Sequence, residues 1–283
     1  MKKIILRLLV ILFFLVLLTR LVTYVAVLTE DALQERNPDG TIAGTEAVKE
    51  EGCTTAVLLL HGFGSSPTDF WQVYPLFDDK GLTIYAPLLA GHGTSPLDLK
   101  ETTYQDWIQS ADDAYLELEG SGHEVIIIGN SLGSLLALQL SMEHDPKEVI
   151  LINPPITLKS KLLRVLPIIG LFEDYHPTRL FSENDETPEF AVKYHNYPIQ
   201  SISELMSIRD ETRKNLYRVD DPLIVFQSEK DTLIEPAGVD IIYQAVSSQE
   251  KEAYLLPHST HTRFSEEDLQ LITDVVEPLL TCD

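Results

Sequence analysis

The chain has 283 residues, of which 44% are apolar, 21 are basic and 44 are acidic, giving a formal charge of −23. This length suits one α/β domain with an insertion, and the apolar content excludes global disorder. The acidic balance argues against nucleic-acid binding, because a phosphate backbone repels an acidic surface.

Residues 1–28 differ from the rest of the chain, because they contain no acid and four basic residues, Lys2, Lys3, Arg7 and Arg20. The remaining residues therefore hold 17 basic and 44 acidic side chains, a formal charge of −27. Residues 4–28 are apolar with few interruptions. As a helix they would be about 37 Å long, enough to cross a hydrocarbon core of ~30 Å.

Two interpretations of residues 1–28 compete. One is a membrane anchor with its basic end in the cytoplasm and the catalytic domain outside. The other is a signal segment that is cleaved to leave a secreted or periplasmic protein. Arg20 argues against the anchor, because a charge near the bilayer centre costs about 3 kcal/mol. The lack of a small-x-small cleavage site before Glu30 argues against the signal segment. Both interpretations export the body of the protein.

The two cysteines, Cys53 and Cys282, would join the start of the body to its end if they pair in an oxidising compartment. The alternative is two unpaired thiols, and the sequence does not choose between them. No Cys-x-x-Cys or His-Glu-x-x-His motif occurs, so we predict no metal site and no cofactor.

Residues 29–54 are polar and turn-rich, which predicts a tether or edge structure. Residues 55–283 then alternate short apolar runs with helical patterns. Nearly continuous apolar runs are typical of parallel strands that are covered on both faces. The predicted strands are 55–60, 82–86, 124–129, 147–152, 222–227 and 251–256.

Helical signals lie between these strands. Ser66 and Pro67 indicate an N-cap followed by proline at the first helical position. Residues 103–119 carry an apolar stripe that is typical of an amphipathic helix. Ser265 is the predicted N-cap of a last amphipathic helix. Residues 155–220 break the alternation with several prolines, short helical patterns and no convincing strand, which predicts a lid insertion. The predicted fold class is α/β: a doubly wound, mostly parallel sheet with a helical lid, preceded by an apolar helix.

The strand at 124–129 runs into Gly129-Asn130-Ser131-Leu132-Gly133 and then into a helical pattern. This is a G-x-S-x-G motif between a strand and a helix, the context in which a sharp turn exposes a serine hydroxyl. The following helix also points its positive end at the site, which favours negative charge there. We therefore predict Ser131 as a nucleophile.

A nucleophilic serine needs a base and an orienting carboxylate. His258 and His261 both follow the strand at 251–256, and spacing alone does not separate them. Glu229 and Asp231 both follow the strand at 222–227, so either fits the expected chain order of serine, acid and histidine.

An oxyanion hole needs backbone N–H donors, one of them from the residue after the nucleophile. Leu132 supplies that amide, and the loop after the strand at 55–60 offers the amide of Phe63 as the second. We interpret His61 and His92, which stand beside glycines, as structural residues that fix loops.

These residues resemble the α/β-hydrolase family, and more narrowly the bacterial carboxylesterase and monoacylglycerol lipase group. The resemblance covers about residues 40–283, in family order, and rests on 61–63 with 66–67, 91–96, 103–107, 129–133 and 227–231. The group's late Ser-Gly-His pattern matches Ser259-Thr260-His261, which favours His261 as the base, and its acid pattern favours Asp231. Thr260 and Ser228 stand where the group usually or commonly has glycine, so we expect altered loop detail.

The resemblance implies a serine hydrolase that cleaves carboxylic esters through an acyl-enzyme, with monoacylglycerols or other lipid esters as candidate substrates. Acyl transfer by the same residues and a non-catalytic binding protein are the alternatives. The apolar residues of the lid, including Leu162, Leu163 and Val165, predict an acyl-chain site or an interfacial contact, or simply lid core. The expected partners are an ester substrate and a membrane contacted by the N-terminal segment. Neither nucleic acid nor a particular oligomeric state is predicted.

Overall fold

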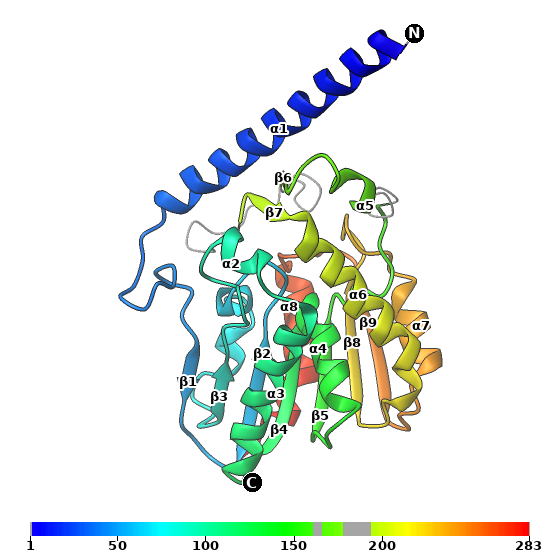
Figure 1. Ribbon diagram of the computed structural model, residues 1–283. Coiled ribbons are helices and arrows are strands. Elements are labelled where there is room, and N and C mark those ends of the chain that lie inside the picture. Colours follow the sequence, from blue (N-terminus) through cyan, green and yellow to red (C-terminus); the bar gives the residue numbers. More distant parts are fainter. Residues whose placement is uncertain (1, 161–165, 178–193, 283) are drawn as a thin grey trace.

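A computed structural model describes residues 2–160, 166–177 and 194–282 of the chain (Figure 1). Part of the predicted lid, including Leu162, Leu163 and Val165, lies outside these described residues. The chain begins with the long helix α1, continues through a central sheet flanked by helices, and ends beside the start of that sheet (Figure 1).

The central sheet has seven strands in the order β1-β3-β2-β4-β5-β8-β9. All neighbours pair in parallel except β1, which pairs antiparallel with β3 at the edge. The α/β class and the mostly parallel sheet are therefore confirmed. The strands are β1 (Val48–Glu50), β2 (Thr55–Leu60), β3 (Thr83–Ala86), β4 (Glu124–Asn130), β5 (Glu148–Ile152), β8 (Leu223–Ser228) and β9 (Lys251–Leu256).

Apolar residues on both faces of the central strands explain their nearly continuous apolar sequences. In β2, Leu58 and Leu60 belong to one buried cluster, whereas Val57 and Leu59 belong to a second cluster on the opposite face. Because successive side chains of a strand point to opposite faces, such a strand must be apolar throughout to be covered twice. The helices and helical turns that cover or connect the strands are η1 (Pro67–Phe70), η2 (Tyr74–Leu76), α2 (Pro96–Lys100), α3 (Tyr104–Gly120), α4 (Leu132–Ser141), α6 (Ile199–Asn215), η5 (Leu216–Arg218), α7 (Gly238–Ala245), α8 (Glu266–Val276) and η6 (Glu277–Leu279).

The predicted lid region contains two kinds of structure. Its first described part holds α5 (Leu166–Ile169) and the short antiparallel pair β6 (Tyr175–Pro177) and β7 (Asn196–Pro198), which the sequence did not indicate. Each of these strands has only three residues and includes a proline, so they lack the length and alternation by which strands are recognised. The second part is α6, whose buried residues Ile202 and Ile208 belong to the same core cluster as α3 and α4.

Helix α1 (Lys2–Ala32) is long and apolar, with a mean hydropathy of 2.7 over its most apolar window, none of which is buried. By length and composition it is sufficient to cross a membrane, although a signal sequence passes the same test. It extends away from the sheet and passes over β6 and β7 (Figure 1).

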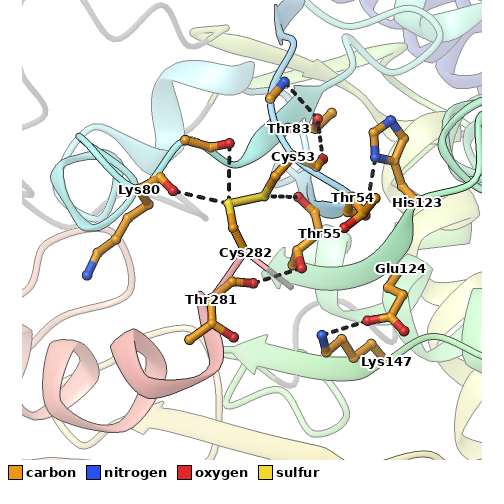
Figure 2. Close-up of a disulfide and its surroundings, with 12 residues drawn as sticks. Cys53, Thr54, Thr55, Lys80, Thr83, His123, Glu124, Lys147, Thr281 and Cys282 are labelled. Atoms are coloured by element: carbon orange, nitrogen blue, oxygen red, sulfur yellow. Dashed lines mark hydrogen bonds and ion pairs between the residues drawn. A yellow bond between two sulfur atoms is a disulfide. The ribbon is translucent and has the colours of Figure 1, made fainter.

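A disulfide joins Cys53, just before β2, to Cys282 at the end of the chain (Figure 2). The two residues are 229 positions apart in the sequence. Beside the disulfide, the Thr55 hydroxyl donates to the Thr281 carbonyl at 2.8 Å, so the C-terminal segment is attached to β2 by two adjacent links. Of the two possibilities that the sequence left open, the structure has the paired one.

We expect the double variant Cys53→Ser/Cys282→Ser to lose about 2–5 kcal/mol of unfolding free energy, because the cross-link restricts a long loop in the unfolded chain. Urea titration of the full chain in detergent measures the change. Reducing agent should lower the wild-type midpoint to that of the double variant and leave the double variant unchanged. Equal midpoints for the oxidised wild type and the double variant would contradict the stabilising role.

Candidate active site

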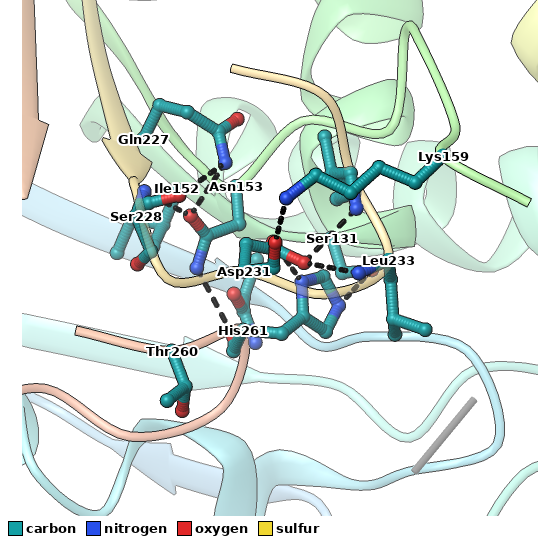
Figure 3. Close-up of polar contacts among 12 residues, drawn as sticks. Ser131, Ile152, Asn153, Lys159, Gln227, Ser228, Asp231, Leu233, Thr260 and His261 are labelled. Atoms are coloured by element: carbon teal, nitrogen blue, oxygen red, sulfur yellow. Dashed lines mark hydrogen bonds and ion pairs between the residues drawn. The ribbon is translucent and has the colours of Figure 1, made fainter. Parts of the chain in front are cut away.

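Several polar residues meet where the parallel strands end. Ser131 follows β4, Asn153 follows β5, Asp231 follows β8 and His261 follows β9, and Figure 3 shows the four together. The carboxyl ends of parallel strands lie at one edge of the sheet, which is where open α/β sheets place their sites. The topology thus brings together residues that are up to 130 positions apart.

Ser131 occupies a sharp turn between β4 and α4. Its backbone has φ 53° and ψ −114°, a conformation that side-chain-bearing residues rarely adopt. The surrounding structure holds this turn, in part because the Ser131 N–H donates to the carbonyl of Ile152 at 2.9 Å. The turn begins α4 at the next residue, so the serine stands at the positive end of that helix.

Steric crowding explains why both outer positions of the G-x-S-x-G motif are glycine. A Cβ atom at Gly133 would lie 1.7 Å from the carbonyl oxygen of Leu60, and one at Gly129 would lie 2.2 Å from the carbonyl oxygen of Gly133. No side chain fits at such distances, so only glycine lets α4 pack this closely on β2 and β4. The motif therefore sets the position of Ser131 relative to the loop after β2.

A chain of hydrogen bonds runs from Asp231 through His261 to Ser131 (Figure 3). His261 Nδ1 lies 2.7 Å from Asp231 Oδ2, and His261 Nε2 lies 3.1 Å from Ser131 Oγ. An ionised carboxylate only accepts hydrogen bonds, so Nδ1 carries the imidazole proton and Nε2 is left to accept the serine hydroxyl. This is the arrangement required to remove a proton from a serine.

Asp231 is fully buried, yet it is stabilised as a carboxylate. Burial by itself would raise the pKa of Asp231, but the charge and hydrogen bond of His261 and the N–H groups of Ile234 and Leu233 lower the pKa overall. Those two N–H groups donate to Oδ1 at 2.9 and 2.8 Å. A lowered folded-state pKa means that the carboxylate stabilises the fold above 3.8, its unfolded value, and that this contribution is lost as the pH falls through the lower folded value.

The alternative residues left open by the spacing lie elsewhere. His258 is exposed and its Nε2 is 3.2 Å from Glu267 Oε2, whereas Glu229 is an exposed residue of the loop after β8. Neither is hydrogen-bonded to Ser131 or His261 among the contacts of the described chain. The geometry therefore brings together Ser131, His261 and Asp231 from the candidate residues.

The loop after β2 lies against Ser131. A Cβ atom at Gly62 would be 3.4 Å from Ser131 Cβ, so the residue before Phe63 lies directly against the serine. Within the described part of the chain, the N–H groups of Phe63 and Leu132 donate to no protein acceptor. The carboxylate of Asp69 holds this loop by accepting the Gly62 N–H at 2.8 Å and the Ser65 hydroxyl. Sequence reasoning missed this role of Asp69.

His61 and His92 are buried beneath the same loop. Burial lowers the pKa of His61, and burial together with the neighbouring His61 lowers the pKa of His92 to about 3, so both rings are neutral at physiological pH. His61 Nε2 accepts the N–H of Leu89 at 3.1 Å, which ties the loop after β2 to the loop after β3. Within residues 2–160, 166–177 and 194–282, no group of three or more His, Cys, Asp or Glu side chains is placed to hold a metal ion.

Asn153 connects the elements that carry Asp231 and His261, and sequence reasoning missed it. Its side-chain Nδ2 donates to the carbonyl of His261 at 3.0 Å, and its Oδ1 accepts the N–H of Ser228 at 2.8 Å (Figure 3). The residue is fully buried, with a positive φ of 51°. Its only sequence signal was an asparagine directly after a predicted strand and before two prolines.

Comparisons with known proteins agree with this fold. Residues 53–268 match the model of the family described as "Serine aminopeptidase, S33". The chain belongs to this family. It is 29% identical over 243 residues to the thermostable monoacylglycerol lipase of Bacillus sp. strain H-257, covering 82% of this chain and 93% of that protein. It is also 27% identical over 236 residues to the carboxylesterase of Bacillus subtilis strain 168, covering 82% and 95%.

Among solved structures, this α/β-hydrolase resembles one titled for LipS and LipT, two metagenome-derived lipolytic enzymes. The TM-score is 0.77 and the identity 25%, over 85% of this chain and 98% of the other. The predicted superfamily is therefore confirmed, and the comparisons support the predicted carboxylic ester hydrolase. This chain covers 93%, 95% and 98% of the two bacterial relatives and the solved structure, respectively.

We expect Asn153→Gly to lower kcat by about 10- to 100-fold with a smaller effect on KM, because His261 and Ser228 lose a shared support and small displacements of reacting groups are costly. Glycine tolerates the positive φ, so the variant removes the side chain without straining the backbone. Asp79→Gly is the matched control, since Asp79 has a φ of 58° and is exposed. Steady-state kinetics, corrected for the folded fraction, check the prediction. A normal kcat in folded Asn153→Gly would show that Asn153 does not position the site.

Proposed function

We propose that this protein hydrolyses carboxylic esters with Ser131 as nucleophile, His261 as general base and Asp231 as the carboxylate that orients the imidazole. The observation that carries the proposal is the hydrogen-bond chain from Asp231 Oδ2 through His261 to Ser131 Oγ, with distances of 2.7 and 3.1 Å. Two amide N–H groups beside the serine, those of Phe63 and Leu132, complete the set of groups that acyl transfer requires.

In the first half of the reaction, Ser131 Oγ attacks the ester carbonyl carbon while His261 Nε2 takes the hydroxyl proton. The carbonyl oxygen becomes an oxyanion and accepts hydrogen bonds from the amides of Phe63 and Leu132. Collapse of this intermediate breaks the bond to the alcohol oxygen, to which His261 returns the proton. Water then attacks the acyl-enzyme with His261 again as base, which releases the acid and restores the serine.

Lipid esters, monoacylglycerols among them, are the substrate class that we propose. Two of the similar proteins are named for lipolysis, and described lid residues such as Ile168, Leu171 and Phe172 expose apolar side chains. Beside the active-site serine, the partly buried ring of Phe63 packs against two buried aromatic rings, with centroids 5.2 Å from Tyr197 and 5.6 Å from Trp107. The exposed apolar side chains of the lid suit contact with an acyl chain or a lipid surface.

We further propose that α1 is a membrane anchor and that the catalytic domain lies outside the cytoplasm. Lys2, Lys3 and Arg7 at the start of the helix favour a cytoplasmic N-terminus. The disulfide between Cys53 and Cys282 is typical of an oxidising compartment, which fits an exported domain.

Replacement of the proposed catalytic groups tests the mechanism. We expect Ser131→Ala to lose turnover by several orders of magnitude and to resist labelling by a fluorophosphonate probe. Asp231→Asn should lower kcat by about 10³- to 10⁴-fold, because the imidazole would no longer be held in the required tautomer. Glu229→Gln and His258→Ala are matched controls from the same two loops and should stay within about twofold. Near-normal ester turnover by Ser131→Ala would disprove the mechanism.

A series of nitrophenyl esters tests the substrate class. We expect kcat/KM to rise with acyl length and to peak at eight or more carbons, because each buried methylene contributes about 0.8 kcal/mol. A maximum at two to four carbons would contradict the lipid assignment while leaving ester hydrolysis intact. Product analysis with added alcohol separates hydrolysis from acyl transfer, and an aminoacyl nitroanilide tests the peptidase activity that the family description names.

A further inference from the structure

Helix α1 is joined to the lid by the side chain of Arg20. Arg20 Nη2 lies 3.2 Å from the carbonyl oxygen of Gly170, 3.4 Å from that of Leu171 and 3.8 Å from Asp174 Oδ1. These three residues follow α5 and lead directly into β6. The charge that argued against a membrane helix therefore has partners, and all of them belong to the lid.

A second contact lies ten residues further along α1, about 15 Å at 1.5 Å per residue. The carboxylate of Glu30 accepts the N–H of His195 at 2.6 Å and the Nδ2–H of Asn196 at 2.9 Å. His195 and Asn196 stand at the start of β7, the partner strand of β6. Both strands of the lid are thus attached to one helix, which Figure 1 shows passing above them.

The same strand reaches the candidate active site. Tyr197, next to Asn196 in β7, stacks on Phe63 with ring centroids 5.2 Å apart. It also packs so closely on the loop after β2 that a Cβ atom at Gly64 would lie 2.1 Å from its ring. The lid strand β7 therefore lies directly beside the loop that leads to the candidate active site.

The position of Arg20 along α1 fits the outer boundary of a bilayer. From Lys3 to Arg20 the helix rises about 26 Å, close to a hydrocarbon thickness of ~30 Å, and basic side chains at such boundaries reach into the headgroup layer. Arg20 contacts the lid at Gly170 and Leu171, so the lid would meet the membrane at this level. The lid patch, defined as Ile168, Leu171 and Phe172, has exposed fractions of 59%, 65% and 43%.

We propose that the lid patch is a membrane-contact surface, covered by the outer leaflet of the bilayer that α1 crosses, and that Arg20 and Glu30 hold the lid there so that the ester enters from that leaflet. The proposal rests on the anchor and the substrate class proposed above. The continuity of the patch with the Arg20 contacts points to its occupant, because a bilayer that contains residues 4–19 of α1 and has its outer boundary at Arg20 would end beside Leu171. Burial of three large apolar side chains would add a favourable contact to the anchor.

Fluorescence quenching tests the surface independently of catalysis. Both native cysteines are in the disulfide, so Leu171→Cys can be labelled alone with an environment-sensitive fluorophore in the full-length Ser131→Ala protein. In vesicles of neutral phospholipid with spin-labelled acyl chains, we expect at least threefold stronger quenching at position 171 than at position 217. Tyr217→Cys is the matched control, because Tyr217 is 64% exposed in η5, at the start of β8 and away from the site. Equal quenching at the two positions would overturn the proposal.

Charge variants test the role of Arg20. We expect Arg20→Asp to lower turnover of monoacylglycerol embedded in vesicles by about fivefold or more, while a soluble short-chain ester is hydrolysed within about twofold of the wild-type rate. The double variant Arg20→Asp/Asp174→Arg should recover the vesicle activity. Equal loss on both substrates, or no loss on either, would overturn the proposal. If the wild-type protein hydrolysed neither the soluble ester nor the vesicle-embedded monoacylglycerol, that result would instead contradict the proposed function. A mature protein that lacks residues 2–28 in its native cell would also overturn the membrane contact.

Discussion

The close packing of α4 on the sheet is the constraint on which the candidate site depends. The absence of a side chain at Gly133 lets its backbone lie directly against the carbonyl of Leu60, and the turn at Ser131 follows from that approach. The same contact brings the loop after β2 beside the serine, as the proposed oxyanion hole of the Leu132 and Phe63 amides requires. A single methyl group at Gly133 would separate these elements.

The electrostatics of the site follow from what surrounds Asp231. Burial of an ionised carboxylate is ordinarily unfavourable, because desolvation raises its pKa. Here two backbone N–H groups and the imidazole of His261 compensate, and the pKa falls instead. In the proposed mechanism, the positive charge that His261 acquires would be balanced by a carboxylate that is already ionised and fixed in place.

The sequence predicted the features that depend on local pattern. The central strands follow from apolar runs, and the turn at Ser131 follows from glycines that have no alternative at their positions. Asn153 and Asp69 could not be predicted, because their roles arise from contacts with segments distant in sequence, such as the carbonyl of His261. Spacing alone left His258 and His261 equivalent. The family resemblance favoured His261, and the three-dimensional arrangement of the loops brings His261, and not His258, to Ser131. The strands β6 and β7 were missed because each is short and contains proline.

The uneven charge of the chain bears on how the body meets a membrane. With a formal charge of −27 outside residues 1–28, the body would be repelled by a leaflet that contains anionic lipids. A patch of three apolar residues is too small to bind a soluble protein to the membrane against that repulsion. A helix that crosses the bilayer changes the situation, because the lid then meets the surface within one molecule at a high effective concentration. In the proposed arrangement, the contacts of Arg20 and Glu30 with the lid would determine which face of the acidic body lies against the lipid.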